Sequence, residues 1–157
     1  MLKDKEVDWV LTGSLSFFIQ SIETDVNDID IQSDKDSILK IQNVLDDYIT
    51  REVVYSESTN IRSYFGKAMI DDVMIELMGD IERCKDGVNW TAPLNIKENR
   101  IWVRYMNMDI PVLDLMYEYE VYIEFGRYEK ARMILSHMEK QRMDDNLIGR
   151  RGSVSRR

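Results

Sequence analysis

Residues 9–32 are the part of this chain that most constrains its fold. Residues 9–12 (Trp-Val-Leu-Thr) form a short apolar run that stops at Gly13, which is the pattern of a buried strand. The apolar residues between Ser14 and Ile22 are spaced as in a short helix that packs on a sheet. After a polar loop, Asp28 to Gln32 alternates acidic or polar residues with isoleucine, which is typical of a half-buried strand. We therefore expect a strand, a Gly-containing turn, a helix and a second strand of one sheet.

The remaining segments extend this pattern to an α/β (α+β) fold, a small mixed β-sheet with flanking helices. Ser33 or Asp34 is placed to cap a helix through residue 48, and Asp71-Asp72 is placed to form a turn between two strands. Further strands are predicted over 51–56, 61–70, 73–78 (ended by Gly79) and 100–105, with a loop-rich segment over 80–100. Helices are predicted from Pro111 to about Phe125, closed by Gly126, and from Tyr128 to about Gln141, which makes a C-terminal αα-hairpin.

The chain is predicted to have three parts. Residues 1–110 form the core, residues 111–145 form a helical hairpin packed on that core, and residues 146–157 form a flexible basic tail. No internal repeat is present.

The composition limits the metal chemistry and the expected location. The chain has one cysteine, Cys84, and one histidine, His137, so a His/Cys zinc site or a Cys-His catalytic pair has too few parts. Any metal must bind oxygen ligands, which favours Mg²⁺, Mn²⁺ or Ca²⁺. The N-terminus is charged, and no apolar run approaches the roughly 18–20 residues that span a bilayer. We expect a cytoplasmic protein with no membrane partner.

The charge is unevenly distributed. The formal net charge is −8, although the last eight residues carry four arginines and no acid. A body this acidic is a poor general binder of nucleic acid, whose affinity comes largely from phosphate neutralisation. It suits a cationic small substrate, but an acidic balance is also common in soluble cytoplasmic proteins.

Asp28 and Asp30 are the candidate metal ligands. Residues two apart in a strand point to the same side, so both carboxylates project together while Ile29 and Ile31 enter the core. Two such carboxylates repel each other unless they are protonated or bridged by a cation, and a hard divalent ion resolves the repulsion. Gly13 and Ser14 stand where a strand turns into a helix, where backbone N–H groups can bind phosphate. The alternative for Ser14 is simple helix capping.

Taken together, Gly13-Ser14 at a strand–helix turn and Asp28-Ile29-Asp30 on the following strand resemble the signature of the nucleotidyltransferase superfamily related to DNA polymerase β. The resemblance covers roughly residues 7 to 80. A run with Tyr122, Gly126, Arg127, Glu129 and Lys130 looks like the C-terminal helices of small antibiotic-transferase-like or toxin-like members.

The resemblance implies a site and a mechanism. Asp28 and Asp30 hold Mg²⁺ (or Mn²⁺), and Glu76, with Asp80 in reserve, is a third carboxylate that binds metal or deprotonates the acceptor hydroxyl. Gly13 and Ser14 steady the β- and γ-phosphates of a nucleoside triphosphate, and pyrophosphate leaves after in-line attack on the α-phosphate. Basic side chains complete phosphate binding, and the candidates are Lys35, Arg62, Lys67 and Arg104.

The implied activity is transfer of a nucleoside monophosphate, most simply AMP from ATP, to a hydroxyl. The acceptor is a small molecule such as an aminoglycoside or lincosamide, a protein, or an RNA end, and the acidic body favours a cationic small molecule. The alternative is a non-catalytic member of the fold that acts as a binding or toxin–antitoxin partner. The oligomeric state is open, with a homodimer as one option.

Overall fold

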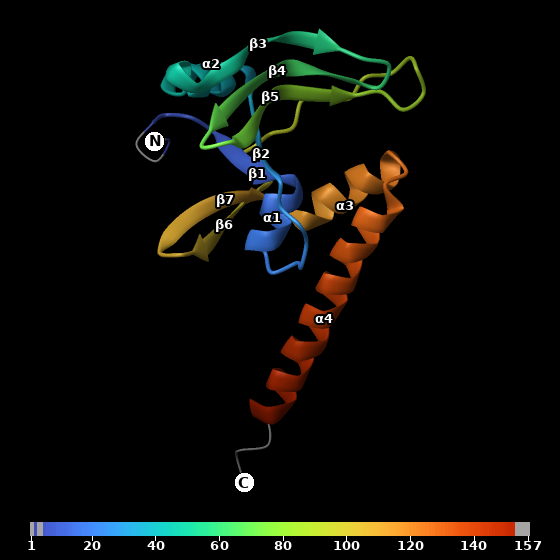
Figure 1. Cartoon of the computed structure of the whole chain (residues 1–157). Coiled ribbons are helices and arrows are strands. Elements are labelled where there is room, and N and C mark those ends of the chain that lie inside the picture. The colour runs from blue at the N-terminus through green and yellow to red at the C-terminus, as the bar shows by residue number, and fades with distance from the viewer. Residues whose placement is uncertain (1, 3–4, 153–157) are drawn as a thin grey trace. The chain divides into compact units, whose positions relative to one another are not determined.

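The computed structural model describes Leu2 and residues 5–152, with side chains described up to Ile148 (Figure 1). The chain divides into two compact units, one up to Asp114 and one from Leu115 onward. This division falls four residues after the domain boundary expected from the sequence, because a strand occupies the segment on which the boundary was placed. Each unit is described on its own.

The first unit is built on a seven-stranded mixed sheet with the order β3-β4-β5-β2-β1-β7-β6. The pairs β2–β5 and β1–β7 are parallel, and the other neighbouring strands are antiparallel. The mixed sheet with flanking helices confirms the expected fold class. The strands are β1 (Trp9–Thr12), β2 (Asp28–Ser33), β3 (Ile49–Glu57), β4 (Ile61–Ile70), β5 (Val73–Arg83), β6 (Arg100–Tyr105) and β7 (Met108–Leu113).

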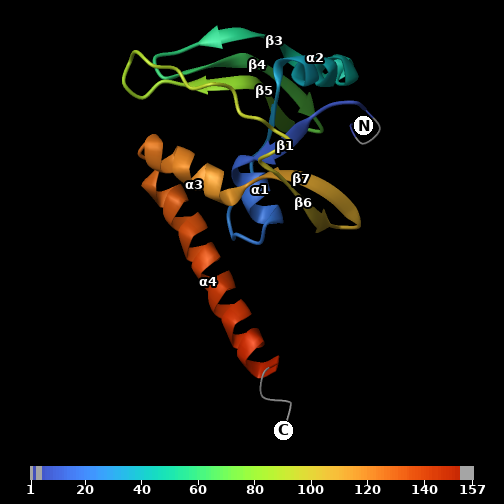
Figure 2. The ribbon, with the colours of Figure 1, turned by 180° about the vertical axis from the view of Figure 1, so that it is seen from behind.

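Two helices and a single 3-10 turn accompany this sheet: α1 (Gly13–Ile19), α2 (Lys35–Val44) and η1 (Asp46–Tyr48). Helix α2 packs on β2, β3 and β5, and α1 packs on β1 and β2, as Figure 1 and the reverse view in Figure 2 show. Ile38 and Ile41 of α2 are fully buried in one hydrophobic cluster with Ile75 and Leu77 of β5. The residues that alternate with this cluster along β2 and β5 therefore lie on the opposite face of the sheet.

Asp34 caps α2, as one of the two residues expected for that role. Its carboxylate accepts hydrogen bonds from the backbone N–H of Ser37 at 2.7 Å and from the Ser37 hydroxyl at 2.9 Å. We expect Asp34→Ala to lower the free energy of unfolding by about 1 kcal/mol, because the helix loses its capping acceptor. Urea denaturation measures this loss. Asp34→Asn keeps an acceptor and should retain most of the stability, so equal losses in both variants would contradict the capping role.

Two expectations for the first unit are wrong. The strand expected to end at Gly79 continues to Arg83, so part of the predicted 80–100 loop is strand. Gly79 is needed inside the strand because α2 lies so close: a Cβ there would be 2.5 Å from Cγ2 of Ile38. The helix expected from Pro111 is also wrong up to residue 114, because Pro111 lies within β7 opposite Trp102 of β6. A proline also fits a strand position where no ladder donor is needed, so it does not by itself mark a helix start.

The second unit is an αα-hairpin of α3 (Leu115–Glu124) and α4 (Tyr128–Gly152). Gly126 closes α3 with a φ of +69°, and Arg127 N–H bonds the Tyr122 carbonyl at 2.8 Å, which together form a glycine-based helix end. Helix α4 includes residues 146–152, which were expected in the flexible tail. Residues 153–157 lie outside the described residues. Among the helices that the structure describes, none is long and apolar enough to cross a membrane.

Candidate active site

Asp28 and Asp30 lie on β2 with half-buried side chains, one on each side of Ile29. Ile29 and Ile31 pack into or against the hydrophobic cluster on the helix-covered face, and Ile31 is almost fully buried. Because side chains alternate along a strand, Asp28 and Asp30 share the other face, called here the carboxylate face. The local alternation of acid and isoleucine is the reason for this placement.

Gly13 brings the backbone directly against Asp30. It follows β1, whose last residue Thr12 is the register partner of Asp30, and its φ is +69°. A Cβ at Gly13 would lie 2.4 Å from Oδ2 of Asp30, so the close approach requires glycine. The N-cap position of α1 is Thr12, which makes no side-chain capping hydrogen bond, and Ser14 lies inside the helix. Ser14 is therefore not the N-cap.

Glu76 lies beside Asp30 in the neighbouring strand. The two residues are register partners of the parallel pair β2–β5, and Glu76 alternates with buried Ile75 and Leu77. Its side chain is 28% exposed, and its Oε1 lies 2.9 Å from the Nζ of Lys67 on β4. The structure therefore brings Asp30 and Glu76 into one row across the sheet, with Lys67 next in that row.

Asp80, the reserve candidate, lies in a different environment. The backbone N–H of Lys35 at the start of α2 donates to its carboxylate, and its pKa is raised chiefly by burial. Its charged neighbours include Asp34 and Asp36. The Asp80 carboxylate thus accepts a hydrogen bond from the first residue of α2.

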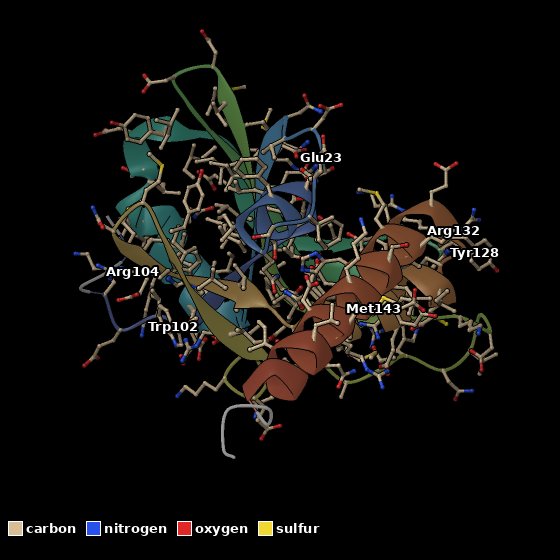
Figure 3. All side chains as sticks on the ribbon, turned by 90° about the horizontal axis from the view of Figure 1, so that it is seen from below. Glu23, Trp102, Arg104, Tyr128, Arg132 and Met143 are labelled. Atoms are coloured by element: carbon tan, nitrogen blue, oxygen red, sulfur yellow. The ribbon has the colours of Figure 1, made fainter. Side chains whose placement is uncertain are left out.

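Of the four basic candidates, only Lys67 is paired with a predicted site residue. Arg62 forms an ion pair with Glu82 at 2.6 Å and stacks on Trp90, and Lys35 lies over the ring of Tyr64. Arg104 projects from the β6–β7 hairpin with Trp102 (Figure 3), and it pairs with Asp109 at 3.0 Å. Sequence spacing alone could not predict the Lys67–Glu76 pair, because it depends on how β4 is aligned with β5.

The donor set on the carboxylate face consists of oxygen atoms, which fits Mg²⁺ or Mn²⁺. Within the described residues, however, no three His, Cys, Asp or Glu side chains are close enough together to form a preformed metal-binding site. Asp28 and Asp30 share a side of one strand, whereas Glu76 is ion-paired with Lys67. The residues therefore fit a metal held by two carboxylates, with further ligands supplied from elsewhere.

A cavity of about 820 Å³ lies apart from these carboxylates. Its walls include Leu11, Ile29, Ile31 and Ile75, whose side chains belong to the helix-covered side of the sheet. Its charged rim includes Arg100, which pairs with Asp8 at 3.2 Å, so this cavity does not coincide with the carboxylate face.

Comparisons with known proteins agree with the observed fold. The profile of the aminoglycoside-2''-adenylyltransferase family matches residues 1–141. A solved protein of Thermotoga maritima, assigned as a nucleotidyltransferase, is 38% identical, with 88% of this chain and 86% of that chain covered and a TM-score of 0.76. The lincosamide antibiotic adenylyltransferase solved with lincomycin bound is 14% identical, with 86% of this chain and 90% of that chain covered and a TM-score of 0.57, which shows a shared fold. No curated protein sequence matches the chain.

The family profile covers the first unit and continues to residue 141 in the second, and the solved Thermotoga maritima structure and this chain are each covered over most of their length. The resemblance seen in Gly13-Ser14 and Asp28-Ile29-Asp30 is thereby confirmed at the level of superfamily, fold and enzyme class. The chain belongs to the aminoglycoside-2''-adenylyltransferase family and is a nucleotidyltransferase.

Proposed function

We propose that this nucleotidyltransferase moves AMP from ATP to a hydroxyl group of a cationic small molecule, with Asp28 and Asp30 as its metal-binding pair. The observation that carries the proposal is the arrangement on the carboxylate face. The carboxylates of Asp28 and Asp30 share one side of β2. The Gly13 backbone lies against Asp30, and Glu76 is the register partner of Asp30 on β5.

Asp28 and Asp30 hold the Mg²⁺ (or Mn²⁺) ion, because carboxylate oxygens are the ligands that these hard cations prefer. The bound ion supplies charge neutralisation for the triphosphate. Gly13 lies against Asp30 and Ser14 follows it in α1. In this proposal the two residues steady the β- and γ-phosphates through backbone and hydroxyl groups. Glu76, the third carboxylate, binds metal or takes the proton of the acceptor hydroxyl. The acceptor oxygen then forms its bond to the α-phosphorus, and the bond to the pyrophosphate oxygen breaks.

The acceptor class is inferred from the relatives and from charge. The matching family is named for adenylylation of aminoglycosides, and the protein that shares the fold was solved with lincomycin. Both compounds carry basic amines, and this chain has a net charge of −8. An acidic protein attracts such cations, which favours a small cationic acceptor over a protein or an RNA end. The cytoplasmic location remains a prediction, as does the homodimer that was named as one option for the oligomeric state.

The proposal is tested by a transfer assay with the full chain. Labelled ATP, GTP, CTP or UTP is incubated with Mg²⁺ and with aminoglycosides, lincosamides, a protein mixture or RNA as acceptors. We expect label from ATP on an antibiotic hydroxyl, and no transfer when EDTA is present. Mg²⁺-dependent nucleotide binding without transfer to any acceptor would favour the alternative of a non-catalytic binding or toxin–antitoxin partner. Absence of Mg²⁺-dependent nucleotide binding would contradict the proposed site.

A further inference from the structure

Glu76 lies between a negative and a positive neighbour on the carboxylate face. Its register partner on β2 is Asp30, and its register partner on β4 is Lys67. Like charges side by side repel, whereas an ammonium attracts a carboxylate. In agreement with this, Glu76 Oε1 lies 2.9 Å from Lys67 Nζ, with side chains only 28% and 32% exposed.

Lys67 is itself held in place by its neighbours. Phe65 stands two residues before it on the same face of β4, and the Lys67 ammonium lies 5.5 Å from the centre of that ring. The Arg51 guanidinium lies 5.0 Å from the same ring centre, and Arg51 is the register partner of Lys67 on β3. A second cation on the far side of Lys67 leaves Glu76 as the favourable partner for its ammonium.

We propose, on the basis of the function proposed above, that Lys67 is a positioning residue. Its ammonium holds the Glu76 carboxylate away from the metal-binding carboxylates of Asp28 and Asp30. Asp28 and Asp30 would then be the protein ligands of the metal, which would supply charge neutralisation for the nucleotide phosphates. Glu76 remains available to accept the proton of the substrate hydroxyl. In that step the hydroxyl proton moves to a Glu76 oxygen, the new oxygen–phosphorus bond forms, and pyrophosphate departs.

Manganese affinity of the full chain without nucleotide tests this role independently of turnover. Free Mn²⁺ is measured by electron paramagnetic resonance at about 0.15 M KCl, where through-space charge effects are partly screened. We expect Lys67→Met to bind Mn²⁺ about tenfold more tightly than the unmodified chain, because Glu76 is released to join the metal as a third carboxylate. Lys67→Arg keeps the positive charge and should stay within about twofold of the unmodified chain.

A double-mutant cycle separates positioning from a simple charge effect. In the E76Q background, Lys67→Met should change Mn²⁺ affinity by less than about twofold, since no carboxylate is left to release. An equal tightening in both backgrounds would overturn the proposal, because the lysine would then act only by repelling the ion. A large loss of Mn²⁺ affinity in E76Q alone would also overturn it, since Glu76 would already be a metal ligand. Weaker nucleotide binding in Lys67→Met with unchanged Mn²⁺ affinity would overturn the proposal as well, because Lys67 would then bind the phosphates of the nucleotide.

Two further variants distinguish failure of this inference from failure of the proposed function. Lys97→Met removes a more exposed lysine, paired with Asp8 at 3.2 Å away from the carboxylate face, and should leave Mn²⁺ affinity unchanged. Asp30→Asn should weaken Mn²⁺ binding strongly. If Asp30→Asn has no effect on Mn²⁺ affinity, the assignment of the metal site is wrong. If Asp30→Asn weakens Mn²⁺ binding but the effects of Lys67→Met and E76Q on Mn²⁺ affinity are additive, only the positioning role of Lys67 is wrong.

Discussion

Asp30→Asn is expected to lower kcat for nucleotidyl transfer by about a thousandfold, since loss of a metal ligand removes several kcal/mol of transition-state stabilisation. Asparagine has the shape of aspartate and keeps one oxygen, so the fold should be retained. Asp30 is the most constrained member of the site: it lies against Gly13 and is the register partner of both Thr12 and Glu76. Its substitution therefore tests the carboxylate face at its centre.

Asp25→Asn is the matched control, because it makes the same charge change at an exposed position in the loop before β2. Initial rates at saturating Mg²⁺ and ATP measure the effect, and thermal melts by circular dichroism confirm folding. Activity of Asp30→Asn comparable to that of Asp25→Asn, with both variants folded, would show that the chemistry takes place elsewhere.

Gly13→Ala is expected to reduce both stability and activity. A left-handed backbone costs a non-glycine residue about 1–2 kcal/mol, and a Cβ at Gly13 also meets a carboxylate oxygen. That oxygen is Oδ2 of Asp30, only 2.4 Å from the Cβ position, so Asp30 must move. We expect a loss of about 1–3 kcal/mol in the free energy of unfolding, together with at least about a tenfold loss of activity.

Gly87→Ala separates the two causes of this effect. Gly87 has a similar φ of +77°, but a Cβ there would meet nothing within 4 Å. It should show the backbone cost alone, with unchanged activity, in urea denaturation and rate measurements. If Gly13→Ala loses no more activity than Gly87→Ala, the contact between Gly13 and Asp30 does not matter for the reaction.

The sequence was informative where the pattern of side chains is local. The strand predicted over residues 61–70 is β4, and alternation placed Asp28 and Asp30 on the face opposite Ile31. The Asp71-Asp72 turn was recognisable because aspartate tolerates the positive φ values that both residues adopt. Each of these features depends on residues a few positions apart.

The features that were missed depend on contacts distant in the sequence. Gly79 looked like a strand end, but it is required where α2 presses on β5, which only the packing of Ile38 reveals. Pro111 looked like a helix start, but the segment pairs with β6 and β1 as a strand. The Lys67–Glu76 ion pair depends on the register of β4 against β5, so the sequence did not predict it. Lys67 was named there only as one of four candidates for binding the phosphates.

Crystallography of the full chain with Mn²⁺ and a non-hydrolysable ATP analogue tests the central claim most directly, because manganese scatters anomalously. We expect an anomalous peak bound by Asp28 and Asp30 and by oxygens of the triphosphate, with Gly13 and Ser14 beside the phosphates. An ordered triphosphate with no anomalous peak at Asp28 and Asp30, or with the manganese bound elsewhere, would contradict the assignment of this site.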